Sequence, residues 1–396
     1  MNRQWKQWNA GLALALFVSL SGAARAADNY EINVILPQTG RASFLGKGEI
    51  RALELVQKAV NAGGGIGGRP LKFTYFDDQS SPQTALQLTN QVLASRPAVV
   101  IGPTIIAQCN AVAPLVQQNG PLLYCLSPGI KPAKGSHVFS ASVSTRDLQT
   151  ALIRYFRLKG WTRVAVITSS DASGQEAEEG INAVMSLPEN KDMKLVAGVR
   201  FDPSDISVSA QIERIKAAQP QFVIAWSTGA AIATVFKGMV QAGLNLPVVT
   251  THGNMTYAQM KQYAAFLPKE LYFPAPLWAA QGANLKLSAE VKKAQDEFYA
   301  AYRAENEMPD ETAELAWGPA MLLVDALRKL GANATGTQIR DYLMNLKGHP
   351  SINGEYDFVA APQRGMGEKN GMVVRWDAAK QVWETMSQPT GIPLAK

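Results

Sequence analysis

The chain is poor in the residues from which enzymes most often build a catalytic or metal centre. Its 396 residues include three histidines, His137, His252 and His349, and none of them has the spacing of metal ligands. No Gly-x-Ser-x-Gly segment is present, which argues against a serine nucleophile. Asp77 and Asp78 are adjacent in an expected strand, where neighbouring side chains point to opposite faces. We therefore expect no catalytic residue, no metal and no cofactor, and a secreted α/β enzyme is a distant alternative.

Two glycine-rich segments also fail the requirements of nucleotide binding. Residues 63–68 (GGGIGG) follow an expected helix and precede an expected strand, whereas a dinucleotide site needs a strand, then glycines, then a helix. Residues 40–48 (GRASFLGKG) have one residue too many between the glycines of a P-loop, and Gly48 replaces the hydroxyl that would hold magnesium. The first segment is better interpreted as a helix stop and turn.

The first 26 residues are typical of a secretory signal peptide. Arg3 and Lys6 precede an apolar run over 11–20 that is too short to span a bilayer, and small residues follow up to an expected cleavage after Ala26. No cysteine stands at the cleavage point to carry a lipid, and no later segment is apolar enough to cross a membrane. We expect a mature chain free in the periplasm, with an uncleaved N-terminal anchor as the alternative.

Excess positive charge is small once the signal peptide is excluded. The formal net charge of +6 falls to +3, because the leader holds Arg3, Lys6 and Arg25 and no acidic residue. No cluster of basic residues remains, so nucleic acid is not an expected partner. The mature length of about 370 residues exceeds one ordinary core and predicts two domains.

Cysteine is limited to Cys109 and Cys125. In an oxidising compartment such a pair is more often bridged than free. The pattern places Cys109 early in a helix and Cys125 late in the adjacent strand, where the two can approach at one sheet edge. A disulfide is our hypothesis, and two small buried thiols are the alternative.

From Glu31 onward, short apolar runs alternate with amphipathic helical stretches. Such alternation predicts doubly wound, mostly parallel sheets, and the two series are each long enough for a sheet of their own. Strands are predicted at 32–37, 71–77, 98–102, 121–126 and 137–142, then near 163–169, 194–201, 221–227, 247–251 and 271–275. Helices are predicted at 46–61, 82–95, 105–118 and 146–159, then near 175–186, 206–218, 230–242 and 256–264.

The last third of the chain has a different pattern. Helices are expected at about 286–305, 312–330 and 337–346, followed by strand-like pieces at 355–358 and 371–376. The end, 388–396, has the composition of a loose tail. We expect this part to pack back on both lobes and to make each lobe discontinuous in sequence.

An ordered series of motifs then resembles one protein family. The segments are 35–40 (ILPQTG), 62–71 (AGGGIGGRPL), 77–82 (DDQSSP) and 100–103 (VIGP). They are similar to the leucine/isoleucine/valine-type (branched-chain amino acid type) periplasmic substrate-binding proteins of ABC transporters, over essentially the whole mature chain. The resemblance implies a type I periplasmic binding protein fold, with two lobes that close on a ligand.

The same resemblance implies the lobe boundaries. Lobe 1 is expected to comprise 27–145 plus 278–355, and lobe 2 to comprise 146–277 plus 356–396. Three crossovers between the lobes are expected near 143–147, 274–280 and 353–358. The implied partners are a small-molecule ligand and an ABC permease in the inner membrane, and the chain is expected to be a monomer. A sensory ligand receptor of the same fold is an alternative.

In the first lobe, the resemblance implies a pocket with altered polar groups. The segment after the third strand, which supplies a hydroxyl for a ligand carboxylate in the amino acid binders, here contains Thr104, Ile105 and Ile106, with Ile106 at the hydroxyl position. The next such turn contains Gly129, Ile130 and Lys131, with Lys131 in place of a threonine.

In the second lobe, His252 stands where an acid would pair with a ligand ammonium. Aromatic walls are missing near Ser173 and Thr228, whereas Phe44 and Trp226 are candidates for the walls of the pocket. Each of these has a structural alternative. Lys131 is also compatible with a solvated loop, and His252 with a strand end. Ser173 is also compatible with a helix cap that it forms with Glu176. Trp226 and Phe44 are also compatible with positions in an ordinary core.

These substitutions predict a ligand that differs from a standard amino acid. A buried ammonium needs a carboxylate partner, because an unpaired buried charge is costly. Lys131 with His252 would instead match an anionic group, beside an apolar slot. We expect a small carboxylate with an apolar or aromatic body, with a short aliphatic acid or an amide next, and a branched-chain amino acid as the alternative.

Overall fold

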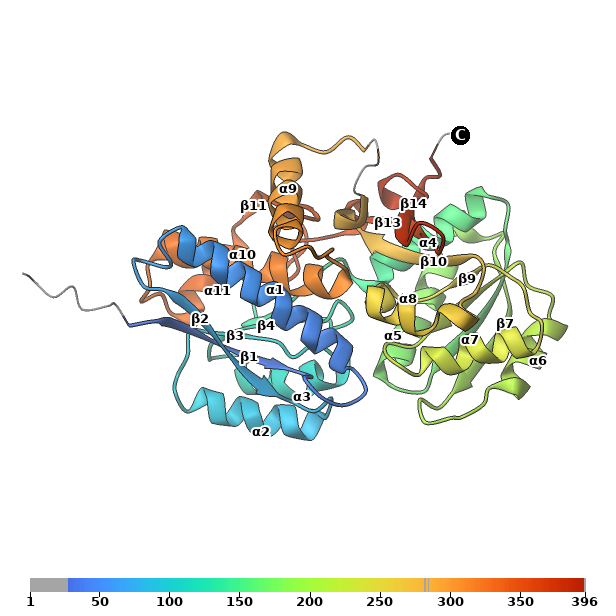
Figure 1. Ribbon diagram of the computed structural model, residues 1–396, viewed down its shortest axis with the longest axis horizontal. Helices are drawn as coiled ribbons and strands as arrows, with labels where there is room; N and C mark the ends of the chain where they lie inside the picture. The colour runs from blue at the N-terminus through green and yellow to red at the C-terminus, as the bar shows by residue number, and fades with distance from the viewer. Residues whose placement is uncertain (1–27, 281–282, 284, 395–396) are drawn as a thin grey trace, which may run out of the picture.

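The chain folds into two α/β lobes that lie side by side (Figure 1). The computed structural model describes residues 28–280, 283 and 285–394. The predicted signal peptide, 1–26, lies outside the described residues. The expected fold class is confirmed, since each lobe is built on its own mostly parallel sheet with helices on both faces.

The first lobe contains a five-stranded parallel sheet in the order β2-β1-β3-β4-β5. Its strands are β1 (Tyr30–Leu36), β2 (Leu71–Asp77), β3 (Val99–Ile101), β4 (Leu122–Cys125) and β5 (Val138–Ser140). Its helices are α1 (Ser43–Ala62), α2 (Pro82–Leu93), α3 (Ile106–Val116), α9 (Ala289–Arg303), α10 (Glu311–Leu330) and α11 (Gly336–Met344). In β1, Val34 joins the core shared with α1 and α10, and its neighbour Ile35 joins the core under α2 and α3. Burial on both faces explains why the inner strands β3 and β4 are continuous apolar runs.

The second lobe contains a seven-stranded sheet in the order β14-β13-β10-β9-β8-β6-β7. Its strands are β6 (Arg163–Ser169), β7 (Lys194–Phe201), β8 (Phe222–Trp226), β9 (Val248–Val249), β10 (Leu271–Pro276), β13 (Gly371–Asp377) and β14 (Val382–Thr385). Its helices are α4 (Thr145–Leu158), α5 (Ala172–Met185), α6 (Ser209–Ala217), α7 (Ile232–Gln241) and α8 (Tyr257–Gln262). The strands from β6 to β10 are parallel, and β13 and β14 are added antiparallel at one edge. In β8, Ile224 packs with α4 and α5, and Ala225 packs toward α6 and α7.

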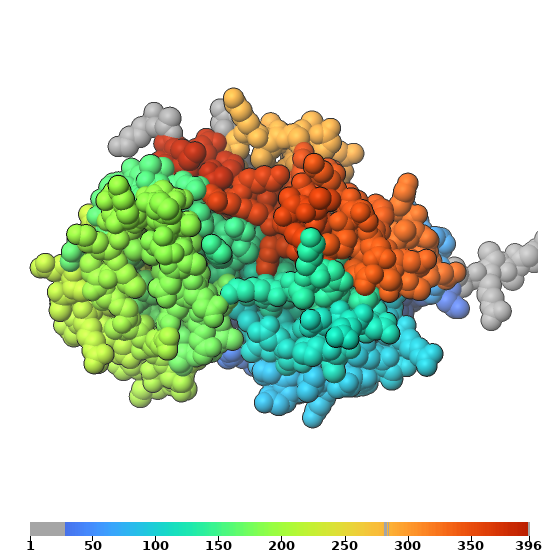
Figure 2. Space-filling model, turned by 180° about the vertical axis from the view of Figure 1, so that it is seen from behind, coloured from blue at the N-terminus to red at the C-terminus, as the bar shows by residue number. Residues whose placement is uncertain are grey.

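The chain passes between the lobes three times. The connections run from β5 to α4, from β10 to α9, and from the hairpin of β11 (Lys347–Ser351) and β12 (Gly354–Asp357) to β13. The third connection therefore covers 358–370, because 354–357 form a strand of the hairpin. Seen from behind, the C-terminal third (orange to red) runs over the junction of the two lobes (Figure 2).

The C-terminal segment differs from the expected loose tail. Val382–Thr385 form the edge strand β14, in which Trp383 is the register partner of Trp376. After it, the hydroxyl of Ser387 accepts a hydrogen bond from the backbone amide of Val373 at 2.9 Å. Arg154 of α4 donates to the carbonyl of Thr390 at 2.7 Å. The prediction of a loose end is wrong for 388–394, because contacts that hold this segment come from distant parts of the sequence.

Candidate functional site: a cleft between the lobes

A narrow cleft collects the ends of parallel strands from both sheets. Loops at the carboxyl ends of such strands converge, and ligands of open α/β sheets bind there. The first lobe contributes Leu45, Thr104, Ile105, Ile106, Leu126, Ser127, Pro128, Gly129 and Leu315 to its lining. The second lobe contributes Thr145, Ser173, Glu176, Trp226, Thr228, Thr251, His252 and Gly253.

The loop between β3 and α3 forms much of the first-lobe wall. Gly102 has a φ of +87°, and a side chain at this position would clash with the carbonyl oxygen of Ile35. The loop therefore passes close over β1, with a cis peptide bond between Gly102 and Pro103. The next two residues, Thr104 and Ile105, are buried in the cleft lining.

Helix α3 begins in this wall without a capping side chain. Its N-cap residue is Ile105, which has no side-chain acceptor. Among the described residues, no acceptor is found for the backbone amides of residues 106–108. The first turn of an α-helix presents free N–H groups at the positive end of the helix dipole. This turn can therefore hold an anion without a basic side chain.

A disulfide between Cys109 and Cys125 ties α3 to β4, as predicted. The two Cα atoms are 6.1 Å apart, and both residues are fully buried. The sulfur of Cys109 lies 3.3 Å from the carbonyl oxygen of Pro103. The bond thus holds the first turns of α3 against the loop that lines the cleft.

The second-lobe wall contains the N-terminus of α5, which is capped. Asp171 accepts a hydrogen bond from the amide of Gly174 at 3.3 Å, so the cap is Asp171 rather than Ser173. The hydroxyl of Ser173 instead lies 2.8 Å from that of Thr228. The structure thus brings these two predicted residues together from the first turn of α5 and the loop after β8.

His252 lines the cleft with both ring nitrogens free of hydrogen bonds among the described residues. Its side chain is buried, and burial lowers its pKa to about 3, with the charge of Arg364 acting in the same direction. The ring is therefore neutral at physiological pH, and offers one donor and one acceptor. Its nearest carboxylate is that of Glu311, with 3.7 Å between Nε2 and Oε1.

Glu176 is an acidic group of the cleft that the sequence interpretation placed only in a helix cap. Its Oε2 is buried and has no partner among the described residues. Burial raises its pKa to about 7, against the opposing effects of Thr145 and of the positive charges of Lys131 and Arg364. The side chain sits on α5 one turn after Ser173, so the S-x-x-E spacing was the available signal.

A buried guanidinium lies behind this wall and was also missed. Arg364, in the third connection, donates to the carbonyls of Ile130 at 2.7 Å and of Ala141 at 3.2 Å. Burial lowers its pKa to about 10, so it keeps its charge at neutral pH. This charge acts on Glu176 and His252, and it makes the second-lobe side of the cleft more favourable to anions.

Three predicted ligand residues lie outside the cavity lining. Phe44 packs with Leu45 and Ile105 beside the cleft, and Ile130 is buried in the core under α3. Lys131 has a side chain 67% exposed and pairs with Glu179 at 2.7 Å. The other predicted residues, which are Thr104, Ile105, Ile106, Gly129, Ser173, Trp226, Thr228 and His252, line the cavity.

The two lobes touch across the mouth of the cleft. Ion pairs join Arg41 to Asp171 at 3.0 Å and Lys131 to Glu179 at 2.7 Å. The enclosed cavity has a volume of about 40 Å³, which is room for about three water molecules. A ligand with many non-hydrogen atoms therefore needs the lobes to separate before it enters.

Residues of the first two connections and of the β11–β12 hairpin surround two buried glutamates of α10. Trp278, in the second connection, donates its indole N–H to Glu311 at 3.0 Å. Asn353, before the third, donates to Glu314. Ser142, in the first connection, acts to lower the pKa of Glu314. Burial nevertheless raises the pKa of both glutamates, and the negative charge of Glu314 raises that of Glu311 further.

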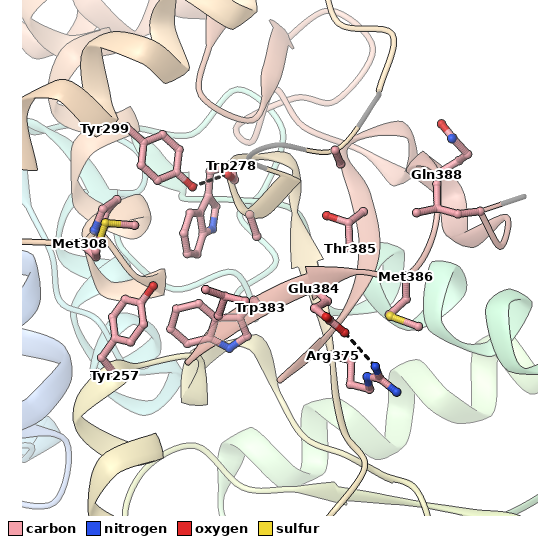
Figure 3. Close-up of a pocket in the computed structure, with 15 residues that line it drawn as sticks. Tyr257, Trp278, Tyr299, Met308, Arg375, Trp383, Glu384, Thr385, Met386 and Gln388 are labelled. Carbon is pink, nitrogen blue, oxygen red and sulfur yellow. Dashed lines mark hydrogen bonds and ion pairs between the residues drawn. The ribbon is translucent and has the colours of Figure 1, made fainter. Parts of the chain in front are cut away.

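A larger cavity of about 740 Å³ lies beside the second connection (Figure 3). Its aromatic residues, Tyr257, Trp278, Tyr299 and Trp383, come from both lobes. An ion pair between Arg375 and Glu384, 2.8 Å long, stands at its edge. The loops that follow the parallel strands of the first sheet do not line it. We therefore assign the ligand site to the narrow cleft.

Within the described part of the chain, no three His, Cys, Asp or Glu side chains are grouped so that they could hold a metal ion. Among the helices of the same residues, none combines the length and the apolar character needed to cross a bilayer.

Two lobes with a cleft between strand ends, lined from both lobes, are typical of proteins that bind a ligand by closing on it. The family model for periplasmic binding proteins matches residues 30–381, and the chain belongs to this family. The resemblance inferred from the sequence is thereby confirmed. Membership makes the chain a binding protein rather than an enzyme.

Relatives of known ligand divide between two chemistries. A leucine-, isoleucine-, valine-, threonine- and alanine-binding protein of Pseudomonas aeruginosa is 23% identical over 240 residues, which are 60% of this chain and 63% of the relative, less than two thirds of its length. A branched-chain amino acid binding protein of Streptococcus pneumoniae, solved with isoleucine, has a TM-score of 0.73 at 19% identity and covers 93% of this chain and 98% of its own. A solute-binding protein of R. palustris, solved with benzoate, has the same TM-score at 17% identity and the same coverage. The fold alone therefore does not select between an amino acid and an aromatic acid.

Proposed function

We propose that this chain is the substrate-binding component of an ABC uptake transporter, free in the periplasm after removal of residues 1–26. It binds a small molecule between its lobes and presents the closed form to a permease of the inner membrane as a monomer. The observation that carries the proposal is a cleft lined from both lobes in a chain of the periplasmic binding protein family.

Closure is the functional motion of this proposal. The moving bodies are the two lobes described above, joined by the three connections. The ligand makes contacts with both walls only in the closed form, so it shifts the population toward closure. The ion pairs at the mouth are exposed and contribute little to the stability of the closed form. The ligand therefore determines the equilibrium between the open and closed forms.

The ligand of this proposal is a small carboxylate with an apolar or aromatic body. The carboxylate docks on the uncapped first turn of α3, and the charge of Arg364 favours it from the other side. The body lies against Ile105, Ile106 and Trp226. Lys131 has no part in this revised site, because its ammonium is paired at the rim.

A branched-chain amino acid is the second candidate, and Glu176 is the observation that favours it. The sequence predicts a ligand without an ammonium because no acid is expected in the pocket. Glu176 supplies one, and its unpaired Oε2 would accept from an ammonium once ionised. The same carboxyl, when protonated, would donate to an acid ligand.

A thermal-shift screen of residues 27–396 tests the proposal. Benzoate, short aliphatic acids, amides, leucine and valine are compared at equal concentration. A ligand far above its Kd raises the stability by about 3–4 kcal/mol. A shift with benzoate or an aliphatic acid, and none with leucine or valine, supports the organic acid, and a shift only with leucine or valine replaces it with the second candidate. No shift with any of them contradicts both.

The Glu176→Gln variant separates the two ligand classes. Loss of the carboxylate should weaken leucine at least tenfold, because a charged hydrogen bond contributes about 1.5–3 kcal/mol. Benzoate should bind the variant as well as it binds the wild type. Glu179→Gln, on the same helix but at the exposed rim, is the matched control and should change neither.

A further inference from the structure

A second buried carboxyl lies behind the first-lobe wall and is not part of the cavity lining. Glu49, on α1, is fully buried, and its Oε2 lies 2.6 Å from the hydroxyl oxygen of Thr104. Thr104 itself is 4% exposed and lines the cleft one residue before the N-cap of α3. A side chain of the ligand site is thus held by a carboxyl group that the ligand does not touch.

The surroundings of Glu49 favour its protonated form. Burial raises its pKa to about 8, and the negative charge of Asp78, which follows β2, acts in the same direction. Asp78 is itself buried, accepts from the amide of Ser80 at 2.8 Å, and has a pKa raised to about 6. The hydrogen bond to Thr104 opposes the shift. Oε1 of Glu49 and Oδ2 of Asp78 have no partner among the described residues, as expected if a proton resides in this group.

The direction of one hydrogen bond depends on that proton. An ionised carboxylate is only an acceptor, so it takes the single hydroxyl proton of Thr104. A protonated carboxyl donates to the oxygen of Thr104 and leaves that hydroxyl proton free for another acceptor. In the first case Thr104 turns only lone pairs toward the cleft, and in the second it can donate there.

We propose that Glu49 is a positioning residue that, when protonated, turns the hydroxyl of Thr104 into a donor for an anionic ligand group at the first turn of α3. The inference rests on the proposed function, since it needs a carboxylate-bearing ligand in the cleft. The hydrogen bond from Thr104 to the ligand, and the affinity that it provides, are lost when Glu49 is deprotonated.

The pH dependence of the dissociation constant is the first test, with benzoate as the probe. Above about pH 8 the affinity of the wild type should fall and then level off about tenfold lower, because one hydrogen bond to a charged group is lost. In Glu49→Gln the amide donates to Thr104 at every pH, so this fall should be absent while affinity near neutral pH stays within about threefold. Glu176 and Glu314 also titrate near 7, so Glu176→Gln is measured in parallel and should keep the fall above pH 8. An unchanged fall in Glu49→Gln overturns the proposal.

A variant at Asp78 and a ligand-free measurement complete the test. Asp78→Asn removes the neighbouring negative charge and should move the midpoint of the fall to lower pH. Infrared spectra of the unliganded wild type near neutral pH should contain the carbonyl band of a buried protonated carboxyl that disappears in Glu49→Gln. An absent band overturns the proposal whatever ligand binds. If benzoate fails to bind and the band is present, the pH series is repeated with leucine. The affinity for leucine should then show the same pH dependence, because leucine also carries a carboxylate. In that case only the proposed ligand class is wrong.

Discussion

The two walls of the cleft offer different chemistry. The first-lobe wall has apolar side chains, Ile105 and Ile106, and an uncapped helix that presents backbone amides. The second-lobe wall begins with a capped helix and carries the ionisable groups His252 and Glu176. The first wall can therefore hold an anion with backbone N–H groups, which do not depend on the identity of the side chains. The second wall has the side chains that distinguish one ligand from another.

The largest expected effect on stability comes from removing the disulfide behind the first wall. Replacing Cys109 and Cys125 together by serine frees a segment with a sequence separation of 16, and should lower the free energy of unfolding by about 3 kcal/mol. Denaturant unfolding with and without a reductant measures it, and the reductant should affect only the wild type. Equal stability of the two proteins would show that packing alone holds α3 on β4.

The second prediction concerns the second wall and its pH dependence. Burial raises the pKa of Glu176 from 4.5 to about 7, so the folded state favours the protonated form. The contribution of Glu176 to the free energy of unfolding is fully present below about pH 4.5. It falls as the pH rises to about 7 and is constant above that. Glu176→Gln removes this loss and should be more stable than the wild type by about 3 kcal/mol above pH 7. Thermal unfolding across pH measures the difference, and a constant difference at all pH values would contradict the assignment.

The third prediction removes one amide from the first wall without removing the helix. Proline is tolerated at the first helical position, and Ile105 already has the extended backbone that must precede it, so Ile106→Pro deletes a single N–H. Affinity for a carboxylate ligand should fall about tenfold. Ile106→Ala is the matched control for the lost side chain. If both variants bind equally well, the amide does not contact the ligand.

The smallest effect is expected at the rim. Lys131→Ala removes an exposed ion pair with Glu179, so both stability and benzoate affinity should change by less than about 0.5 kcal/mol. Calorimetric titration against benzoate measures it. A loss of tenfold or more would restore Lys131 to the ligand site and move the anion away from α3.

Much of the fold follows from local pattern. The expected strands at 71–77, 163–169 and 194–201 have the observed bounds. Strand β6 is a distinct apolar run because it is buried on both faces, whereas β2 and β7 are partly exposed edge strands. The edge strand Val382–Thr385 was missed, since its stability comes from pairing with β13 and from the contact between Trp376 and Trp383. Such partners are not visible in a window of neighbouring residues.

The site was predictable to the extent that it follows strand ends. Thr104, Ile106 and His252 were expected there and line the cleft, because loops after parallel strands converge at one edge. Lys131 was also expected there, but it lies at the exposed rim, where its partner Glu179 comes from the other lobe. Arg364 was missed because it reaches the back of the cleft from the third connection.

The sequence by itself determined the class of this protein, because the alternation of apolar runs with amphipathic helices and the ordered series of motifs are patterns of residues close together in the chain. The tertiary structure decided which side chains meet across the cleft and which protons they hold. Glu49 and Glu176 are ordinary surface-type residues in the printed sequence. Their raised pKa values arise only from burial, which is a property of the folded chain as a whole.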